Sequence, residues 1–158
     1  MADAEAHWAG EDHEMRRRFD SPGRPPLERV RAVMREWIDA RAAGGPNFVY
    51  ALRHPDGLLM GGCEIRLRSP DRANVSYWIY PACRGQGHAP RAMALLATAA
   101  AQIPGLKQLE AHIDPDNLAS RRVAEKSGFH QTGTVEDESW AGEKSIRLLY
   151  SRPVGPRP

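Results

Sequence analysis

The stretch VSYWIYPACRGQGHA, residues 75–89, decides which fold this chain is expected to adopt. In its first part, Val75, Tyr77 and Ile79 alternate with the side chains between them, a period of two that is typical of a β-strand. Pro81 ends the strand, and a glycine-containing turn leads into a helical stretch rich in alanine and leucine. The segment is therefore predicted to be a strand, a glycine-rich turn and a helix.

The turn between this strand and this helix has the composition of an anion site. A helix N-terminus offers several amide donors without intrahelical partners and about half a positive charge, so it attracts phosphate. Gly85 and Gly87 lack a Cβ atom that would block the approach of an anion, and Ala89 is nearly as small. Arg84 adds a cation at the entrance. The turn suits a pyrophosphate, and it matches neither a Walker loop nor a dinucleotide-binding fingerprint.

A second motif follows further along the chain. The segment NLASRRVAEKSGF, residues 117–129, resembles the Asn-x-x-Ser and Glu-Lys-x-Gly-Phe pattern of the ribosomal-protein N-terminal (alanine/serine) acetyltransferases. The pattern Arg84-x-x-Gly87-x-Ala89 resembles the coenzyme A loop of the GNAT N-acetyltransferase superfamily, to which that branch belongs. Two such motifs in this order are hard to obtain by chance. The resemblance extends over roughly residues 48–150.

The resemblance implies a mixed α/β (α+β) fold with a central, mostly antiparallel sheet flanked by helices. The fourth and fifth strands of such a sheet splay apart, and the acyl thioester of the coenzyme lies in the opening. Here those strands would be residues 73–80 and 106–113. The family usually begins with a strand ahead of its first helices, and no such segment is found ahead of Trp8, so that strand is expected to be missing.

The same resemblance implies a set of coenzyme-binding residues. Strand backbone at the edge of the opening pairs with the pantetheine arm, which behaves like an added strand. Amides of the turn hold the pyrophosphate, and two residues after the fifth strand contact the coenzyme near its thiol end. In chain order these residues are Trp78, Ile79 and Tyr80, then Arg84, Gly85, Gln86, Gly87, His88 and Ala89, and finally Asn117 and Ser120.

Acetyl-CoA is thus the expected co-substrate, and a neutral amine attacks its thioester directly, which requires no metal. Many family members carry a tyrosine as general acid seven residues after the asparagine, but that position is Ala124 here. The related branch suggests Ser120 as the substitute that hydrogen-bonds the leaving sulfur, unless this serine acts only within its helix. For the general base we favour Glu110, whose position resembles that of a carboxylate in some relatives; a solvated strand glutamate is the alternative. His112 shares the same strand face, and water chains from Glu64 or Glu136 are a further alternative.

The rest of the chain is interpreted from its hydrophobic periodicity. Apolar residues from Leu27 to Ile38 recur at three- and four-residue spacing, which predicts an amphipathic helix ended by Gly44 and Gly45. The other predicted elements are strands at 48–52, 58–67, 73–80 and 106–113, helices at 89–100 and 117–126, and a final hairpin with strands at 129–135 and 145–152. The predicted order is α, β, β, β, α, β, α, β, β.

Residues 1–152 are predicted to form a single N-acetyltransferase domain, followed by a flexible proline-rich tail at 153–158. Ahead of the first predicted helix, Glu11 and Glu14 could supply carboxylates for a cationic acceptor. Dimers are common in the family, and the resemblance therefore also implies that a homodimer could form.

Composition argues against several other classes of protein. The 158 residues are 41% hydrophobic and 27% charged, an ordinary globular balance. The basic residues are spread along the chain, so we expect no nucleic-acid partner, and no apolar run is long enough for a membrane helix. The acidic N-terminus lacks a secretory signal, which predicts a cytoplasmic protein with reduced Cys63 and Cys83. The histidines and cysteines lack metal-ligand spacing, so no metal site is expected.

Two classes of function follow from the sequence. The leading one is an N-acetyltransferase that acts on a protein N-terminus, an aminoglycoside-like amine or another small-molecule amine. The other is a non-catalytic acyl-CoA-binding or regulatory domain, which the alanine at position 124 allows.

Overall fold

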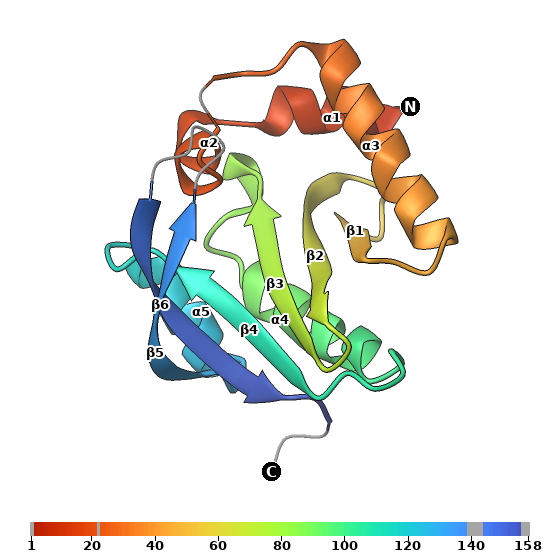
Figure 1. The fold of residues 1–158 in the computed structure, drawn as a ribbon. Coiled ribbons are helices and arrows are strands. Elements are labelled where there is room, and N and C mark those ends of the chain that lie inside the picture. Colours follow the sequence, from red (N-terminus) through yellow and green to blue (C-terminus); the bar gives the residue numbers. More distant parts are fainter. Residues whose placement is uncertain (1, 22, 139–143, 156–158) are drawn as a thin grey trace.

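Six strands form one sheet in the order β1-β2-β3-β4-β6-β5 (Figure 1). The computed structural model describes residues 2–21, 23–138 and 144–155. Neighbouring strands are antiparallel except for β3 and β4, which are parallel. The strands are β1 (Asn47–Arg53), β2 (Leu59–Ser69), β3 (Arg72–Ile79), β4 (Gln108–Ile113), β5 (His130–Glu138) and β6 (Lys144–Pro153). The predicted mixed fold with a mostly antiparallel sheet is confirmed.

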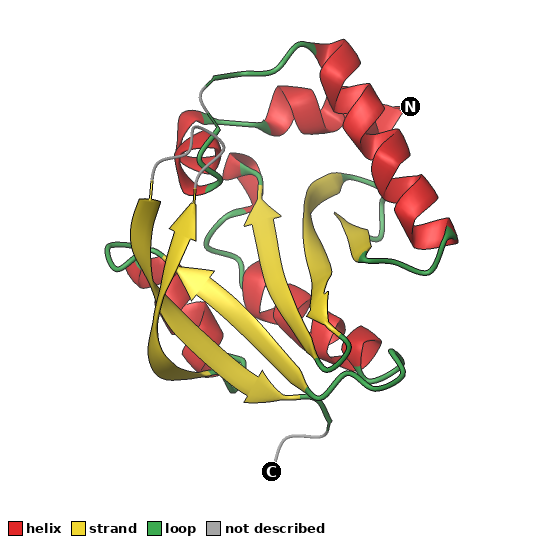
Figure 2. Cartoon of the chain, viewed as in Figure 1, coloured by secondary structure: helices red, strands yellow, loops and turns green. Residues whose placement is uncertain are grey.

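Helices flank this sheet (Figure 2). They are α1 (Ala2–Gly10), α2 (His13–Arg18), α3 (Leu27–Ala42), the short 3-10 helix η1 (Pro81–Cys83), α4 (His88–Ala100) and α5 (Leu118–Lys126). Every element predicted from periodicity is present. The sequence did not predict α1 and α2, because α1 gathers no clear apolar stripe and α2 has only six residues. The described chain ahead of β1 holds helices and no strand.

The main core lies between the sheet and the pair α4 and α5. The predicted alternation is confirmed in β4, where Leu109, Ala111 and Ile113 are buried and the residues between them are partly exposed. Further core residues come from β2, β3, α4 and the last hairpin. They include Ile65, Val75, Ile79, Met93, Leu96, Phe129 and Tyr150.

The opposite face of the sheet meets α1 and α3 at the β1–β2 end, where buried residues are few (Figure 1). Aromatic rings provide much of the contact there. His7 of α1 lies edge-on to both Trp37 of α3 and Trp78 of β3, with ring centroids 6.4 and 5.8 Å away. This contact holds the N-terminal helices against the end of β3.

The two parallel strands separate soon after they start. Pairing between β3 and β4 covers only Arg72–Asn74 against Gln108–Glu110, whereas β3 continues to Ile79 and β4 to Ile113. Beyond Asn74 and Glu110 the facing backbone edges have no ladder between them in the described part of the chain. Since backbone N–H and C=O groups need partners, this V-shaped opening is suited to receive another extended segment. The predicted splay is confirmed.

Several smaller expectations concern the thiols and the chain end. Cys63 and Cys83 are both free and buried, and burial raises the pKa of the Cys63 thiol to about 12.

None of the described helices is long and apolar enough to span a bilayer. The strand β6 reaches into the predicted tail, and the Val154 amide donates to the Lys107 carbonyl oxygen at 2.8 Å. Residues 156–158 of that tail lie outside the described residues.

Candidate functional site

The glycine-rich turn at the start of α4 presents open backbone. Gly85 and Gly87 have φ angles of 76° and 78°, a left-handed conformation that favours glycine. A Cβ atom built at either position would meet nothing within 4 Å, so the turn faces free space. Gly87 is the N-cap of α4 and provides no side-chain hydrogen bond to the first helical amides. These amides are therefore exposed donors at the positive end of a helix.

Arg84 does not act as a loose cation at this turn. Its Nε donates to the Ile79 carbonyl oxygen at 3.0 Å, and its two terminal nitrogens donate to both carboxylate oxygens of Asp12 at 2.6 and 2.9 Å. Asp12 is also the N-cap of α2, where its side chain accepts from the Met15 amide. The hydrogen bond from Arg84 is the first cause that lowers the pKa of Asp12. Arg84 thus ties α2 to the end of β3 and to the turn.

The other side chains of the turn stay on its surface. The Gln86 side chain donates to the Ala82 carbonyl oxygen at 3.1 Å, and its amide oxygen lies 3.3 Å from the His88 ring. His88 and Ala89, the first two residues of α4, are partly exposed. Backbone contacts with the coenzyme were expected from these residues, and the positions of their side chains leave the backbone amides accessible.

At the end of β3, the residues expected to contact the pantetheine arm differ in the direction of their backbone amide groups. The Tyr80 amide donates to the Met60 carbonyl oxygen on β2 at 2.9 Å. Because successive residues of a strand direct their amide groups to alternate sides, Trp78 shares that direction. Tyr77 and Ile79 instead direct theirs into the opening. The geometry moves the expected contact from Trp78 and Tyr80 to Ile79 and its neighbour Tyr77, which the sequence interpretation did not include.

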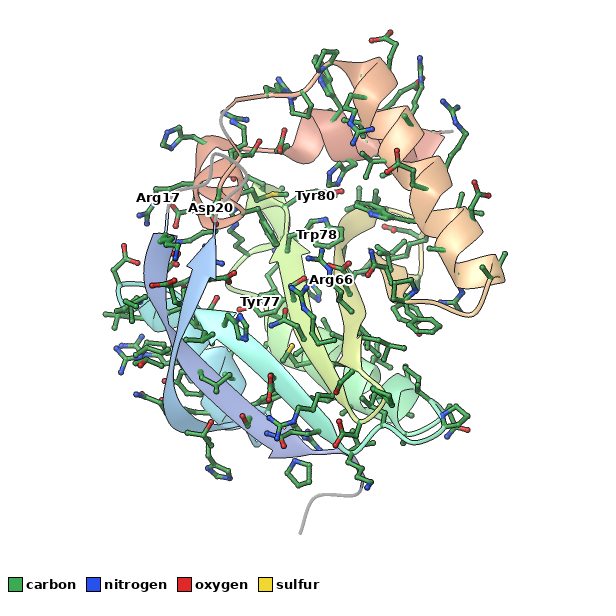
Figure 3. The ribbon with its side chains drawn as sticks, viewed as in Figure 1. Arg17, Asp20, Arg66, Tyr77, Trp78 and Tyr80 are labelled. Carbon is green, nitrogen blue, oxygen red and sulfur yellow. The ribbon has the colours of Figure 1, made fainter. Side chains whose placement is uncertain are left out.

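The side chains of Trp78 and Tyr80 serve packing (Figure 3). The Trp78 indole lies over Gly62, and the Tyr80 hydroxyl is 2.8 Å from Nδ1 of His7. Burial raises the pKa of Tyr80 to about 12. Burial also lowers the pKa of His7, which keeps this ring neutral. The two residues anchor α1 to the strand that forms one wall of the opening.

The other wall of the opening leads into α5. Asn117 caps this helix, and its side-chain oxygen accepts from the Ser120 amide at 3.1 Å. The Ser120 hydroxyl lies 3.0 Å from the Tyr77 hydroxyl, so this contact joins α5 to β3 across the opening. A signal for Tyr77 was present in the sequence, since the period of two put it on the same face as Val75 and Ile79.

The polar face of β4 holds the two candidate bases. Glu110 sits at the last paired position, opposite Asn74, and its Oε1 accepts from Arg72 at 3.1 Å and from Gln108 at 3.4 Å. His112 lies two residues further towards the open end. Its Nδ1 is 3.3 Å from Oδ2 of Asp137 on β5. The structure brings a histidine and a carboxylate together there, a pairing that the sequence did not predict.

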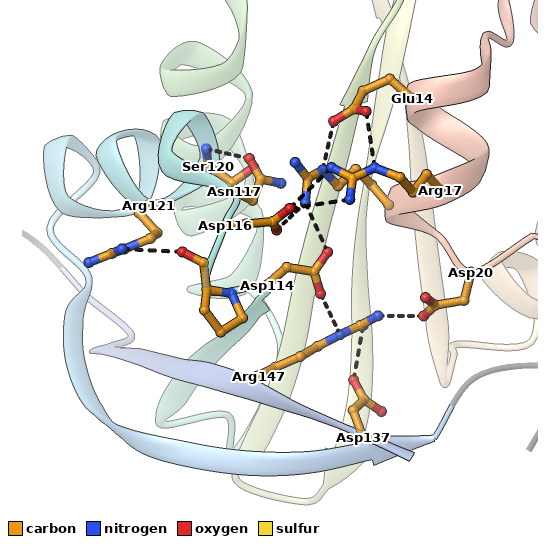
Figure 4. Close-up of polar contacts among 12 residues, drawn as sticks. Glu14, Arg17, Asp20, Asp114, Asp116, Asn117, Ser120, Arg121, Asp137 and Arg147 are labelled. Carbon is orange, nitrogen blue, oxygen red and sulfur yellow. Dashed lines mark hydrogen bonds and ion pairs between the residues drawn. The ribbon is translucent and has the colours of Figure 1, made fainter. Parts of the chain in front are cut away.

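Charged residues join the C-terminal end of α2 to the loop after β4 (Figure 4). Arg18 donates to Asp114 at 3.2 Å and to Asp116 at 2.6 Å, and Arg17 donates to Asp116. Glu14 accepts from both arginines. Together with the pair formed by Arg84 and Asp12, these contacts fix α2 to both walls of the opening.

This network changes what the two expected acceptor carboxylates can do. Glu14 forms ion pairs with two arginines, so its charge is largely compensated within the protein. Glu11 has only 13% of its side chain exposed and lies 3.9 Å from Arg16. Burial is the first cause that raises the pKa of Glu11.

A cavity of about 220 Å³ lies on the N-terminal side of the opening. It is bounded by α1, α3, the middle of β1, the start of β2 and the end of β3, and its lining is mainly aromatic and apolar. The lining includes Asp3, His7, Trp37, Arg41, Trp78 and Tyr80.

Comparisons with known proteins identify the family. The family model described as the acetyltransferase (GNAT) domain matches residues 1–130. A comparison with curated protein sequences found no match.

Solved structures with the same fold include three acetyltransferases. The microcin C7 self-immunity acetyltransferase MccE, in complex with acetyl-CoA and AMP, has a TM-score of 0.84 at 14% identity, covering 97% of this chain and 88% of its own. The spermidine N-acetyltransferase from Vibrio cholerae, with CoA and spermine, has a TM-score of 0.80 at 13% identity, covering 97% and 90%. The ribosomal L7/L12 alpha-N-protein acetyltransferase RimL has a TM-score of 0.73 at 18% identity, covering 96% and 83%. These similarities establish a shared fold.

Proposed function

Because this chain belongs to the GNAT acetyltransferase family, we propose that it transfers the acetyl group of acetyl-CoA to a primary amine by direct attack in a ternary complex. The observation that carries the proposal is the position of the glycine turn. Its exposed helix amides lie beside the end of β3, where β3 and β4 have already separated. An anion site and an unpaired strand edge thus adjoin, as a pyrophosphate joined to an extended pantetheine arm requires.

The residues present suit the coenzyme in two respects. The amides from Gly85 to Ala89 would hold the pyrophosphate, and the positive φ angles of the two glycines aim that backbone outward. The backbone of Tyr77 and Ile79 would pair with the pantetheine arm. The Ile79 carbonyl oxygen already accepts from Arg84, so its amide and the Tyr77 backbone groups are the ones left for the ligand.

The family assignment argues against the non-catalytic alternative, and titration tests both the site and the activity. Calorimetry with acetyl-CoA, ATP and NAD in separate titrations should give micromolar binding of acetyl-CoA alone. Thiol release should then be followed with spermidine, kanamycin and a peptide with an N-terminal serine as acceptors. Absence of acetyl-CoA binding would contradict the coenzyme site. Binding without thiol release from any acceptor would favour a regulatory domain.

Two side chains of β4 are candidates for the group that removes the proton from the attacking amine. One oxygen of Glu110 already accepts two hydrogen bonds, and the residue sits where the strands are still paired. When Nδ1 of His112 donates to Asp137, its Nε2 is left as a proton acceptor beyond the point of separation. This geometry favours His112, with Asp137 fixing the ring, over Glu110.

Matched substitutions decide between these two candidates. His112→Asn should lower kcat by about 100-fold or more, as expected when a general base is removed, whereas Glu110→Gln should change it less than about fivefold. Both variants should bind acetyl-CoA with wild-type affinity in calorimetry. A large loss of kcat in Glu110→Gln with little loss in His112→Asn would return the role to Glu110.

The bond between Asp12 and Arg84 should influence coenzyme affinity, although Asp12 is far from the turn in sequence. Asp12→Asn removes the charge that holds Arg84 against Ile79, so the turn is less well fixed. We expect acetyl-CoA to bind about three- to tenfold more weakly, with partial recovery in Asp12→Glu. Asp56→Asn is the matched control, because Asp56 also accepts from a backbone amide but lies in the β1–β2 turn. Equal affinities in the Asp12 and Asp56 variants would contradict this coupling.

A further inference from the structure

We infer that Tyr77 supplies the proton for the leaving thiolate and that Ser120 passes it on. This inference rests on the proposed function, since it concerns the second half of the same acetyl transfer. It assigns a role to a side chain of β3, whereas the sequence interpretation looked for the acid on α5 alone.

The two hydroxyls form a short chain across the opening. The Tyr77 hydroxyl is 3.0 Å from the Ser120 hydroxyl, within the range of an O–H···O hydrogen bond. The cap formed by Asn117 holds the Ser120 amide and so fixes the first turn of α5. Ser120 therefore stands at the wall of the opening with a hydroxyl partner on the opposite strand.

The surroundings keep Tyr77 in the protonated form that an acid requires. Tyr77 is half-buried, and burial is the first cause that raises the pKa of its phenol, ahead of a smaller lowering by the bond to Ser120. A phenol with a raised pKa holds its proton at neutral pH, so the proton is available to be donated as negative charge develops on the leaving sulfur.

Ala124 explains why a tyrosine from another element is needed. Ser120 and Ala124 are four residues apart on α5, so they lie on the same face of the helix. Ala124 is 2% exposed and contributes only a methyl group to that face. A hydroxyl reaches this face from β3 instead, through the contact between Tyr77 and Ser120.

The proton balance closes without any further reactant. The amine nitrogen forms a bond to the carbonyl carbon, the carbon–sulfur bond breaks, and the sulfur leaves with the electron pair. The thiolate takes the Ser120 proton while Ser120 takes the proton of Tyr77. The resulting phenolate is protonated again by the proton that the amine gave up to the base and to water. The products are an amide and a thiol.

Three variants test the relay: Tyr77→Phe, Ser120→Ala and the double variant. Each is compared with the wild type in thiol release, using whichever of spermidine, kanamycin and the N-terminal serine peptide turns over fastest. Each single variant should lower kcat by about 100-fold or more, because a positioned general acid contributes on that scale. The double variant should lose no more than the worse single one, since the two groups act as a unit. The Kd for acetyl-CoA should stay within about threefold of the wild-type value.

Tyr150→Phe is the matched control. Tyr150 of β6 is also a strand tyrosine bonded to α5, with its hydroxyl donating to Glu125 at 3.3 Å and accepting from Arg121, but its side chain is fully buried in the core. Its loss removes a comparable strand-to-helix hydrogen bond and should leave kcat unchanged. Ser120→Thr keeps a hydroxyl and should recover most of the activity lost in Ser120→Ala.

Several results would overturn the relay. They are an unchanged kcat in Tyr77→Phe, additive losses in the double variant, or an equal loss of kcat in Tyr150→Phe. A wild-type protein that binds acetyl-CoA but releases no thiol with any acceptor would overturn the transfer reaction itself. That outcome is distinct, because it appears before any variant is compared.

Discussion

Replacing Gly87 by aspartate should weaken acetyl-CoA binding by at least about 100-fold, to below detection in calorimetry. The new carboxylate would stand at the N-terminus of α4, where the exposed amides and the helix dipole should hold the pyrophosphate. It would both repel the coenzyme and take the amide donors for itself. The backbone itself tolerates the change, because φ is 78° and aspartate is among the residues that adopt this conformation most readily.

Gly57→Asp provides the control for that substitution. Gly57 also has a positive φ, 93°, and also faces open space, but it lies in the turn between β1 and β2. The Gly57→Asp substitution introduces the same side chain and a similar backbone strain, but away from α4. The two variants should show similar thermal midpoints and differ only in coenzyme affinity. A folded Gly87→Asp protein with wild-type affinity would remove the turn from the coenzyme site.

The second large effect concerns stability. Gly61→Ala should lower the free energy of unfolding by about 3 kcal/mol, which corresponds to roughly 10 °C in the thermal midpoint. A Cβ atom at this position would lie 2.1 Å from the Trp78 carbonyl oxygen, and φ is 155°. The obstacle is backbone, so β2 and β3 must move apart for an alanine to fit. Since β3 forms one wall of the opening, coenzyme affinity should fall as well.

Gly133→Ala separates this close approach from the general effect of a strand glycine. Gly133 lies in β5, is exposed, and has nothing within 4 Å of a built Cβ atom. Alanine there should leave the thermal midpoint unchanged or raise it slightly, because alanine has less freedom than glycine in the unfolded chain. Equal midpoints for the two alanine variants in a thermal melt would contradict the packing of Gly61 against β3.

Much of the fold could be predicted because its helices and strands have characteristic patterns over a few neighbouring residues. The alternation in β4 and the turn with Gly85 and Gly87 are patterns of neighbouring residues, and the structure has them at the predicted places. The α1 and α2 helices were not predicted because they lack such a local pattern. Their positions depend on contacts with distant residues, such as Asp12 with Arg84 and His7 with Tyr80, rather than on a local apolar stripe.

The candidate site divides in the same way. The glycine turn and the start of α5 could be predicted from the sequence, because a helix start has a local signature, whereas the expected roles of Asn117 and Ser120 at the coenzyme came from the resemblance. The partners of these residues could not be predicted, since a hydrogen bond such as the one between Tyr77 and Ser120 joins residues 43 positions apart. The spacing of residues in the sequence does not indicate that one oxygen of Glu110 is already hydrogen-bonded or that His112 pairs with Asp137.

The sequence by itself determined the succession of strands and helices from residue 27 onwards, the glycine-rich turn ahead of α4 and the resemblance to the family. Periodicity and the special conformations of glycine are properties of the chain over a few residues, and they act before any distant contact forms. The tertiary structure alone decided which groups face the opening, and with them the pairing of His112 with Asp137, the engagement of Arg84 and the contact of Tyr77 with Ser120. Such choices depend on where β3, β4 and α2 come together, and long-range packing fixes that arrangement.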